Sequence, residues 1–337
     1  MITCRQIRLG GLGTYLDIDD PAAIVKGHCL CGELGLDVDM AAVEMGWAFE
    51  LFELGIIDTS DTGGLELVWG NHAAAIELLK RIAYRRGLGE LLANGVKRAA
   101  AILGRGSERY AMHIKGAGLN ERGLRTHQAW ALGIAVSARG GGHLDGAPMT
   151  EGGMVDPETG EAAPVDPETA EAIFGTRHAG ERGTYKGKAK VVFWQEKFKA
   201  VVDMMGMCYF TGMWPDLNLL GPADYAALFR LATGSSLSGD ELMEIGRRVH
   251  NVEKAFNTLH ADLTRDDDFL PARFYEEPVE SGPFAGEVLD RDQWGKMLDE
   301  YYALEGWNAA TGQQTEAGLK SIGLDSVAEK LKRFGKL

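Results

Sequence analysis

The chain has 337 residues and a mass of 36.5 kDa, which is enough for two domains or one large one. Its formal net charge of −14 argues against nucleic acid and anionic membranes as partners. No stretch approaches the ~18 apolar residues of a membrane helix, and the first residues lack the apolar region of a signal peptide. We therefore expect a cytoplasmic protein.

Most of the chain has the 3.6-residue periodicity of amphipathic helices. In chain order, helices are expected over residues 21–36, 39–55, 72–87, 89–104, 188–206, 222–234, 238–260 and 290–307. One short strand is expected at 65–70, and the glycine- and proline-rich stretch 139–190 predicts a surface excursion. The predicted fold is mainly α, in two domains over residues 1–112 and 113–337.

Two segments end a predicted helix on a glycine and then present a polar side chain. The first is Gly32-Glu-Leu-Gly35-Leu36-Asp37, and the second is Asp203-Met-Met-Gly206-Met207-Cys208. Such an end exposes backbone carbonyls, and a cysteine there can bind iron as the thiolate. From the residues alone, two ordinary helix caps explain the pattern better than a binding site does.

A histidine, His143, follows the run Arg139-Gly-Gly-Gly. A glycine run lets a ligand approach the backbone closely, and the unperturbed pKa of histidine, ~6.5, suits proton transfer. The alternative is a loop histidine that is hydrogen-bonded to a carbonyl. Sequence alone favours this alternative.

The two segments resemble the paired DxxGL(D/C) motifs of the aldehyde:ferredoxin oxidoreductase family. Further segments that are similar to the family include YAMHIKG, SARGGGHLDG and FNTLHADLTRDDDFLPARF, in the family's order and from about Leu9 to the end. The resemblance implies two helical domains, the family's second and third, facing a cofactor cleft. It also implies that the family's amino-terminal β domain is missing from this sequence.

The resemblance further implies the cofactors and the residues that hold them. These cofactors are a tungsten (or molybdenum) bis-pyranopterin and a [4Fe–4S] cluster. Cys208 would be one cluster ligand, and His143 would be a proton donor or acceptor beside the metal. The implied cofactor-binding residues are Gly35, Leu36, Asp37, Arg139, Leu144, Asp203, Gly206, Met207 and Cys208.

The sequence also departs from the family pattern. Gly32 stands where the family has an aspartate, and no CxxCx3C run supplies the other three cluster cysteines. Cys4 stands alone, whereas Cys29 and Cys31 are expected to be core thiols. The implied cluster therefore has one of its four ligands in this chain.

The implied function is the oxidation of aldehydes to carboxylic acids, with electrons passing through the cluster to ferredoxin. A separate partner chain would supply the missing domain, and a homo-oligomer is an additional expectation. Two alternatives stay open: a relative that acts on another substrate, such as an aryl-CoA thioester, and a non-catalytic remnant or scaffold. Whether the chain is an enzyme on its own is undecided by the sequence.

Overall fold

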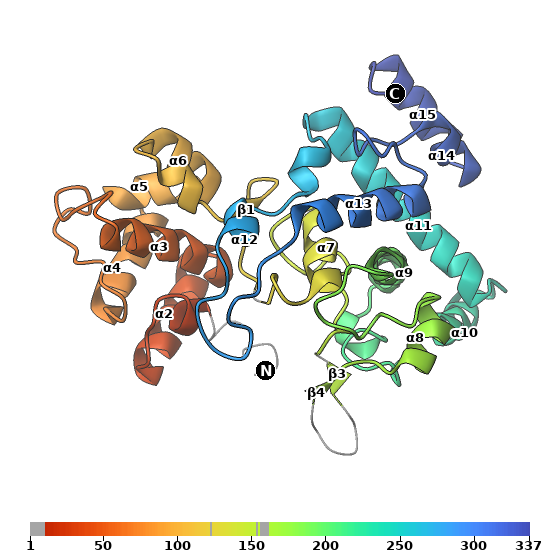
Figure 1. Ribbon diagram of the computed structural model, residues 1–337, viewed down its shortest axis with the longest axis horizontal. Helices are drawn as coiled ribbons and strands as arrows, with labels where there is room; N and C mark the ends of the chain where they lie inside the picture. Colours follow the sequence, from red (N-terminus) through yellow and green to blue (C-terminus); the bar gives the residue numbers. More distant parts are fainter. Residues whose placement is uncertain (1–10, 122, 153, 156–161) are drawn as a thin grey trace. The chain divides into compact units, whose positions relative to one another are not determined.

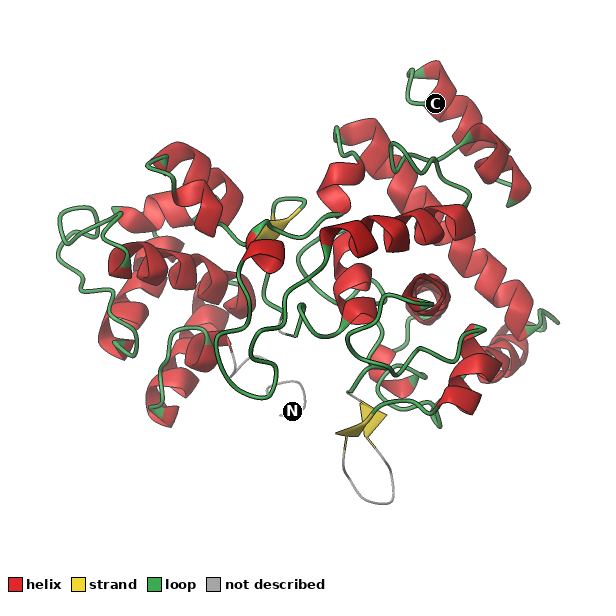
Figure 2. Ribbon diagram, viewed as in Figure 1, coloured by secondary structure: helices red, strands yellow, loops and turns green. Residues whose placement is uncertain are grey.

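The computed structural model describes residues 11–121, 123–152, 154–155 and 162–337, and helices dominate it (Figure 2). The chain forms two compact units, Met1–Asn120 and Glu121–Leu337. The expectation of a mainly α fold is confirmed. Within the described residues, no helix is both long enough and apolar enough to cross a membrane.

The first unit is a cluster of helices (Figure 1), and its buried apolar residues form one hydrophobic core among the residues that the structure describes. Its elements are α2 (Pro21–Leu34), α3 (Val38–Glu53), α4 (His72–Ala83), α5 (Leu88–Leu92), α6 (Val96–Leu103), η1 (Ser107–Tyr110), β1 (His113–Ile114) and β2 (Ala117–Gly118). Helix α3 is the most buried of them, with Met45, Phe49 and Leu51 inaccessible to solvent. The strands β1 and β2 form a two-stranded antiparallel hairpin, in which His113 pairs with Gly118.

The second unit is built around one central helix. It contains α7 (Gln128–Val136), β3 (Met154–Val155), β4 (Ala162–Ala163), α8 (Pro167–Phe174), α9 (Lys188–Met204), η2 (Tyr209–Thr211), α10 (Pro222–Thr233), α11 (Gly239–His260), η3 (Arg265–Asp268), α12 (Arg273–Glu276), α13 (Arg291–Glu305), α14 (Glu316–Ser321) and α15 (Asp325–Arg333). Figure 1 shows α9 end-on, and α7, α10, α11 and α13 all pack against it. Strands β3 and β4 pair antiparallel.

Local sequence signals explain most of the helix ends. The Asp20 side chain caps α2, and Pro21 is the first residue of that helix. Ser238 and Glu241 form a capping box at the start of α11, as their spacing predicts. Helix α2 ends at Gly35, whose φ of 69° is readily adopted by glycine.

Three local expectations are wrong. Residues 65–70 are not a strand, because side chains bind the backbone there: Thr62 donates to the carbonyl of Leu65, and Asn71 donates to that of Glu66. The predicted helix over 89–104 is two helices, α5 and α6, separated at Gly95, where φ is 83°. The stretch 139–190 contains helix α8 and several buried residues, so it is not only a surface excursion.

Candidate functional site

The first predicted motif lies at the junction of α2 and α3. Gly35 closes α2 in the left-handed conformation, and the amide of Leu36 donates to the carbonyl of Cys31 at 2.8 Å. Asp37 then caps α3, with its Oδ1 accepting from the amides of Asp39 at 3.0 Å and Met40 at 2.9 Å. The Asp37 carboxylate is exposed, so its other oxygen remains accessible to a ligand.

The second motif ends α9. The chain turns at Gly206, which has φ of 65°, and the amide of Met207 donates to the carbonyl of Val202 at 3.2 Å. The carboxylate of Asp203 is paired with the ammonium group of Lys199, one helical turn earlier. Cys208 follows with an exposed thiol and precedes η2. An exposed thiol after a helix end is a suitable position for a soft metal ligand.

His143 is held on three sides. Its Nδ1 lies 2.5 Å from Oε1 of Glu121, which also accepts from the backbone amide of His143 at 3.2 Å. The imidazole is stacked between two indoles: the ring centroids of Trp130 and Trp214 lie 5.2 Å and 5.4 Å from that of His143. With Nδ1 bound to a carboxylate, Nε2 is the ring nitrogen available for proton transfer.

The aromatic stack connects His143 to the second motif. Trp214 stacks on Tyr209, with ring centroids 4.8 Å apart, and Tyr209 directly follows Cys208. The indole N–H of Trp214 donates to the carbonyl of Ala147 at 2.7 Å, which fixes its ring plane. Four rings are therefore stacked one on the next, in the order Trp130, His143, Trp214 and Tyr209, from α7 to the residue after Cys208. Hereafter we call these four residues the aromatic stack.

The loop before His143 has its own supports. One oxygen of Asp145 accepts from the Ser137 hydroxyl at 2.6 Å and from the amide of Arg139 at 3.0 Å. The side chain of Asn257, on α11, donates to the carbonyl of Ala138 at 2.7 Å. The side chains of Arg139 and Leu144 are exposed. They are thus available for a ligand, while the backbone that carries them is fixed.

A carboxyl on α11 also faces this region. The pKa of Glu253 is raised by burial and by the nearby negative charges of Asp145 and Asp203, although Lys199 opposes the shift. The loop before His143 and the second motif therefore share an electrostatic environment in the second unit.

The second unit contains His143, Arg139 and Leu144 as well as Asp203, Gly206, Met207 and Cys208, and the aromatic stack connects His143 to Tyr209, the residue after Cys208. Gly35, Leu36 and Asp37 belong to the first unit, and their approach to Cys208 remains a prediction. Sequence reasoning did not identify Glu121, Trp130, Tyr209 or Trp214. The available signal was the density of aromatic residues directly after the candidate ligand Cys208.

The remaining cysteines agree only in part with expectation. Cys31 is buried, and burial, with a contribution from Asp37, raises the pKa of its thiol to about 11. This is the inert core thiol that was predicted. Cys29 is exposed, so its assignment to the core is wrong, because it faces outward from α2. Cys4 lies outside the described residues.

A cavity of about 400 Å³ lies beside the aromatic stack. Its lining includes His127, Trp130, Pro148, Met149 and the buried Glu151. Glu151 pairs with the ammonium group of Lys188 at 2.9 Å and accepts backbone N–H groups at the start of α7, so its charge is compensated. We call this space the Trp130 cavity.

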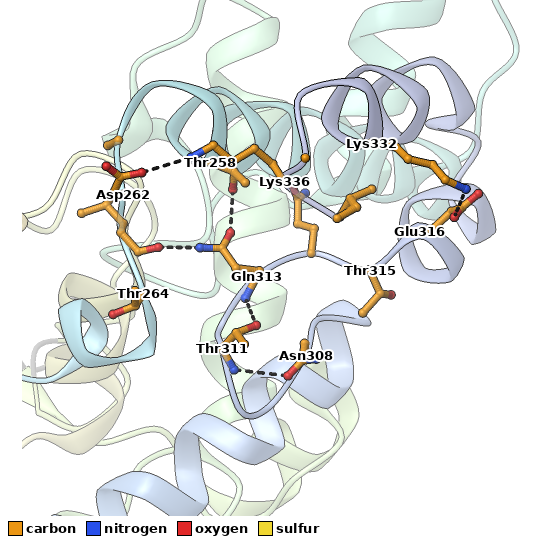
Figure 3. Close-up of a pocket in the computed structure, with 15 residues that line it drawn as sticks. Thr258, Asp262, Thr264, Asn308, Thr311, Gln313, Thr315, Glu316, Lys332 and Lys336 are labelled. Carbon is orange, nitrogen blue, oxygen red and sulfur yellow. Dashed lines mark hydrogen bonds and ion pairs between the residues drawn. The ribbon is translucent and has the colours of Figure 1, made fainter.

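A larger cavity of about 630 Å³ has a different character (Figure 3). It lies where the end of α11 meets the carboxy-terminal residues, and Figure 3 shows its wall of threonine, asparagine and glutamine side chains. Its charged groups are already engaged with one another, as in the pairs Lys332–Glu316 at 3.0 Å and Lys336–Asp262 at 3.1 Å. None of the predicted cofactor-binding residues lines it, although five of its residues belong to the family-like segment 256–274.

One buried cluster could hold a metal ion by ligand type. It comprises Glu196, His250 and Glu305, whose ligand atoms lie within 4.8 Å of one another. However, the hydroxyl of Tyr301 donates to Glu196 at 2.8 Å and lies 3.1 Å from Nε2 of His250, and Arg247 lies 3.8 Å from Glu305. The cluster therefore has its own hydrogen bonds and counter-charge, and we interpret it as a core network.

Comparison with known proteins confirms the family resemblance. Residues 8–324 match the family model "Aldehyde ferredoxin oxidoreductase, domains 2 & 3". A tungsten-containing aldehyde ferredoxin oxidoreductase of Pyrococcus horikoshii is 32% identical over 318 residues, covering 93% of this chain and 47% of the relative. The WOR-like subunit of an aliphatic sulfonate oxidoreductase of Pyrococcus furiosus is 29% identical over 342 residues, covering 96% of this chain and 46% of that relative.

A solved structure shows the same fold. It is the active site complex BamBC of benzoyl coenzyme A reductase in complex with 1,5-dienoyl-CoA, with a TM-score of 0.74 and 23% identity over 99% of this chain and 50% of that one. This structure shows the fold alone, and the family model assigns the two units to a class of helical domains, the second and third of their family. The chain belongs to the aldehyde ferredoxin oxidoreductase family, and it spans about half the length of the curated relatives it matches.

Proposed function

We propose that these residues form the helical part of a tungsten-pterin oxidoreductase that oxidises aldehydes to carboxylic acids. In this reaction an aldehyde and water give a carboxylic acid, two protons and two electrons. The observation that carries the proposal is the exposed Cys208 thiol next to the aromatic stack that holds His143. The electrons would leave through a [4Fe–4S] cluster to ferredoxin.

The residues of this chain fit a tungsten bis-pyranopterin cofactor in part. The exposed carboxylates of Asp37 and Asp203 and the exposed guanidinium of Arg139 suit the N–H and phosphate groups of pterins. Gly35, Leu36, Leu144, Gly206 and Met207 would contact the same cofactor. When bound, the metal and its pterins would supply the two-electron redox chemistry. Molybdenum in place of tungsten would need no change in these residues.

His143 would supply proton transfer. Glu121 holds Nδ1, and the two indoles prevent rotation of the ring, so a proton can be held or released at Nε2 in a fixed direction. This arrangement supports a general acid–base role.

Cys208 alone does not make a cluster site. A [4Fe–4S] cluster is usually held by four cysteine thiolates, and the described cysteines of the second unit comprise Cys208 only. In our proposal a partner chain contributes the other three, together with the part of the relatives' length that these residues do not span. We therefore expect the chain purified alone to show no low-temperature EPR signal of a reduced cluster.

Two other functions are supported by particular observations. The similarity to the WOR-like subunit of the sulfonate oxidoreductase supports the same cofactor with another substrate. Gly32, in place of the family's aspartate, supports a scaffold that no longer binds the cofactor.

The test is metal and pterin analysis of anaerobically purified protein, expressed with its genomic neighbours. Tungsten and pterin at near-stoichiometric levels are expected, with iron reduced in Cys208→Ser and unchanged in Cys29→Ser, which alters another exposed thiol. Protein free of metal and pterin in every such preparation would favour the scaffold, whereas loaded protein that is inactive on aldehydes would favour the other substrate.

A further inference from the structure

Trp130 belongs to two features of the second unit at once. Its ring stacks on His143, with 5.2 Å between centroids, and it also lines the Trp130 cavity. A molecule in the cavity would therefore contact the same indole that holds the proposed proton-transfer residue. At about 400 Å³ the cavity is within the usual range for sites of small molecules.

The cavity carries little net charge. Glu151 is paired with Lys188, so its carboxylate is not available to a cationic ligand. The pKa of His127 is lowered by burial and by the nearby positive charges of Arg182 and Lys188. A hydrogen bond to the carbonyl of Gly123 raises this pKa, but by less. The lowered pKa favours the neutral imidazole, so among the described lining residues none offers an unpaired charge to a charged or phosphorylated substrate; outside them, the guanidinium of Arg182 lies next to Gly152.

The remaining surface suits a flat apolar group. Trp130, Pro148 and Met149 offer an indole face, a ring edge and a polarisable thioether, which pack well against an aromatic ring. Glycines complete the wall near His127: a Cβ on Gly123 would lie 3.0 Å from its Nδ1, and one on Gly152 would lie 3.3 Å from its Nε2. Larger residues at these two positions would crowd the His127 ring and reduce the space.

We propose that the Trp130 cavity binds the ring-bearing end of an uncharged substrate, so that aryl or cycloalkyl aldehydes are preferred to short-chain or charged ones. This inference rests on the proposed function for the chemistry, but the binding itself needs no cofactor. The aldehyde end would pass the edge of the Trp130 indole toward His143.

The test uses the full chain without cofactor and benzamide as a stable, uncharged ring probe. Methionine methyl groups are labelled with ¹³C, and the Met149 signal is assigned by its loss in Met149→Leu. Benzamide is expected to shift that signal saturably, with a dissociation constant on the order of 1–10 mM for so small a ligand. Acetamide, which lacks the ring, is expected to cause no saturable shift at tenfold higher concentration.

Two variants locate the site. Met149→Phe fills the cavity and is expected to weaken benzamide binding at least fivefold, detected by saturation-transfer NMR on the ligand. Thr311→Phe fills the other cavity, shown in Figure 3, and is expected to leave binding unchanged. Thermal unfolding of each variant shows whether it is folded. If Met149→Phe is unfolded, Trp130→Phe, which keeps an aromatic ring on this wall of the cavity, serves as the second variant in the benzamide experiment.

The inference is overturned if benzamide causes no saturable shift, if acetamide binds equally well, or if Met149→Phe leaves binding intact. Its failure differs from failure of the proposed function, because the latter is read from tungsten and pterin content. In a loaded enzyme, Met149→Phe should lower kcat/KM for benzaldehyde at least fivefold more than it lowers kcat/KM for acetaldehyde.

Discussion

At the scale of single residues, the bond between Glu121 and His143 decides what the imidazole can do. A carboxylate is an acceptor only, so the 2.5 Å contact fixes the proton of the neutral ring on Nδ1. Replacement by glutamine removes that constraint, because an amide presents either a donor or an acceptor. Glu121→Gln is therefore expected to change His143 from a predominant Nδ1–H tautomer to a mixture, as measured by ¹⁵N NMR of the imidazole nitrogens.

A matched control is available elsewhere in the same unit. Glu181 lies 2.9 Å from Nδ1 of His178, a more exposed pair. Glu181→Gln should alter the signals of His178 and leave those of His143 unchanged. An unaltered His143 tautomer in Glu121→Gln would show that Glu121 is not a positioning residue.

Gly32 is a second position where one residue can be tested. A Cβ at Gly32 would meet nothing within 4 Å, so the family's aspartate fits without steric cost. Gly32→Asp should leave the free energy of unfolding unchanged or raise it by ~0.3 kcal/mol, because glycine is the poorer helix former. Retention of the pterin by the loaded protein should increase as well.

The comparison variant for this prediction is Gly27→Asp, on the same helix. A Cβ at Gly27 would lie 2.8 Å from Cδ1 of Leu12, and the site is buried, so a loss of ~2 kcal/mol or more is expected. Urea unfolding followed by tryptophan fluorescence compares the two. A decrease of ~2 kcal/mol in the free energy of unfolding of Gly32→Asp would mean that the helix surface around Gly32 is packed against another part of the protein.

The candidate site could be predicted only in part from the sequence. The Gly–apolar–Asp and Gly–apolar–Cys endings locate helix ends, because a left-handed glycine is a local signal. The partners of His143 are not local: Glu121 is 22 residues away, and Trp214 comes from a later part of the chain, where its indole N–H donates to the carbonyl of Ala147. A single sequence carries no spacing rule for such contacts.

At the scale of elements, the start of α7 depends on a buried ion pair. The helix carries Trp130, and its first amides donate to Glu151, which is paired with the fully buried Lys188. Lys188→Met leaves the buried Glu151 without its cation and should lower the free energy of unfolding by ~3–5 kcal/mol. Urea unfolding measures this change, and the exposed Lys186→Met should stay within ~0.5 kcal/mol of the wild type.

Most elements could be predicted because their determinants are local. Asp20 with Pro21 and Ser238 with Glu241 are caps that act within one turn. The errors arise where the conformation of one residue or a distant group decides the structure: Gly95, with φ of 83°, ends the first part of the expected helix 89–104, and α6 starts after it. Likewise, the fully buried Lys188 lies in a stretch whose composition indicated an exposed loop.

At the scale of the whole molecule, stability should fall as pH rises through the weakly acidic range. Burial raises the pKa of Glu44 in the first unit and of Glu305 in the second to about 7 in each case. Their unfolded pKa is about 4.5, so between pH 4.5 and 7 the native state binds more protons than the unfolded state. Their stabilising contribution is thus complete below pH 4.5 and lost by pH 7, roughly 3 kcal/mol for each group.

Chemical unfolding at several pH values, with Glu44→Gln and Glu305→Gln as variants, measures this dependence. Each variant should flatten the pH profile of its own unit, because an amide does not ionise. A profile that rises over this range in the wild type would contradict the assignment of both groups.

Helix α9 supports several of these features at once. Lys188 compensates Glu151 at the start of α7, Gln195 donates to the hydroxyl of Tyr209 at 2.6 Å, and Lys199 pairs with Asp203 of the second motif. Substitutions along this one helix should therefore show strong epistasis, with coupling energies of ~0.5–3 kcal/mol in double-mutant cycles. In evolution, residues at the start of α7 and residues of the second motif would therefore change in a correlated way, since a substitution on α9 that affects one of these regions also affects the other.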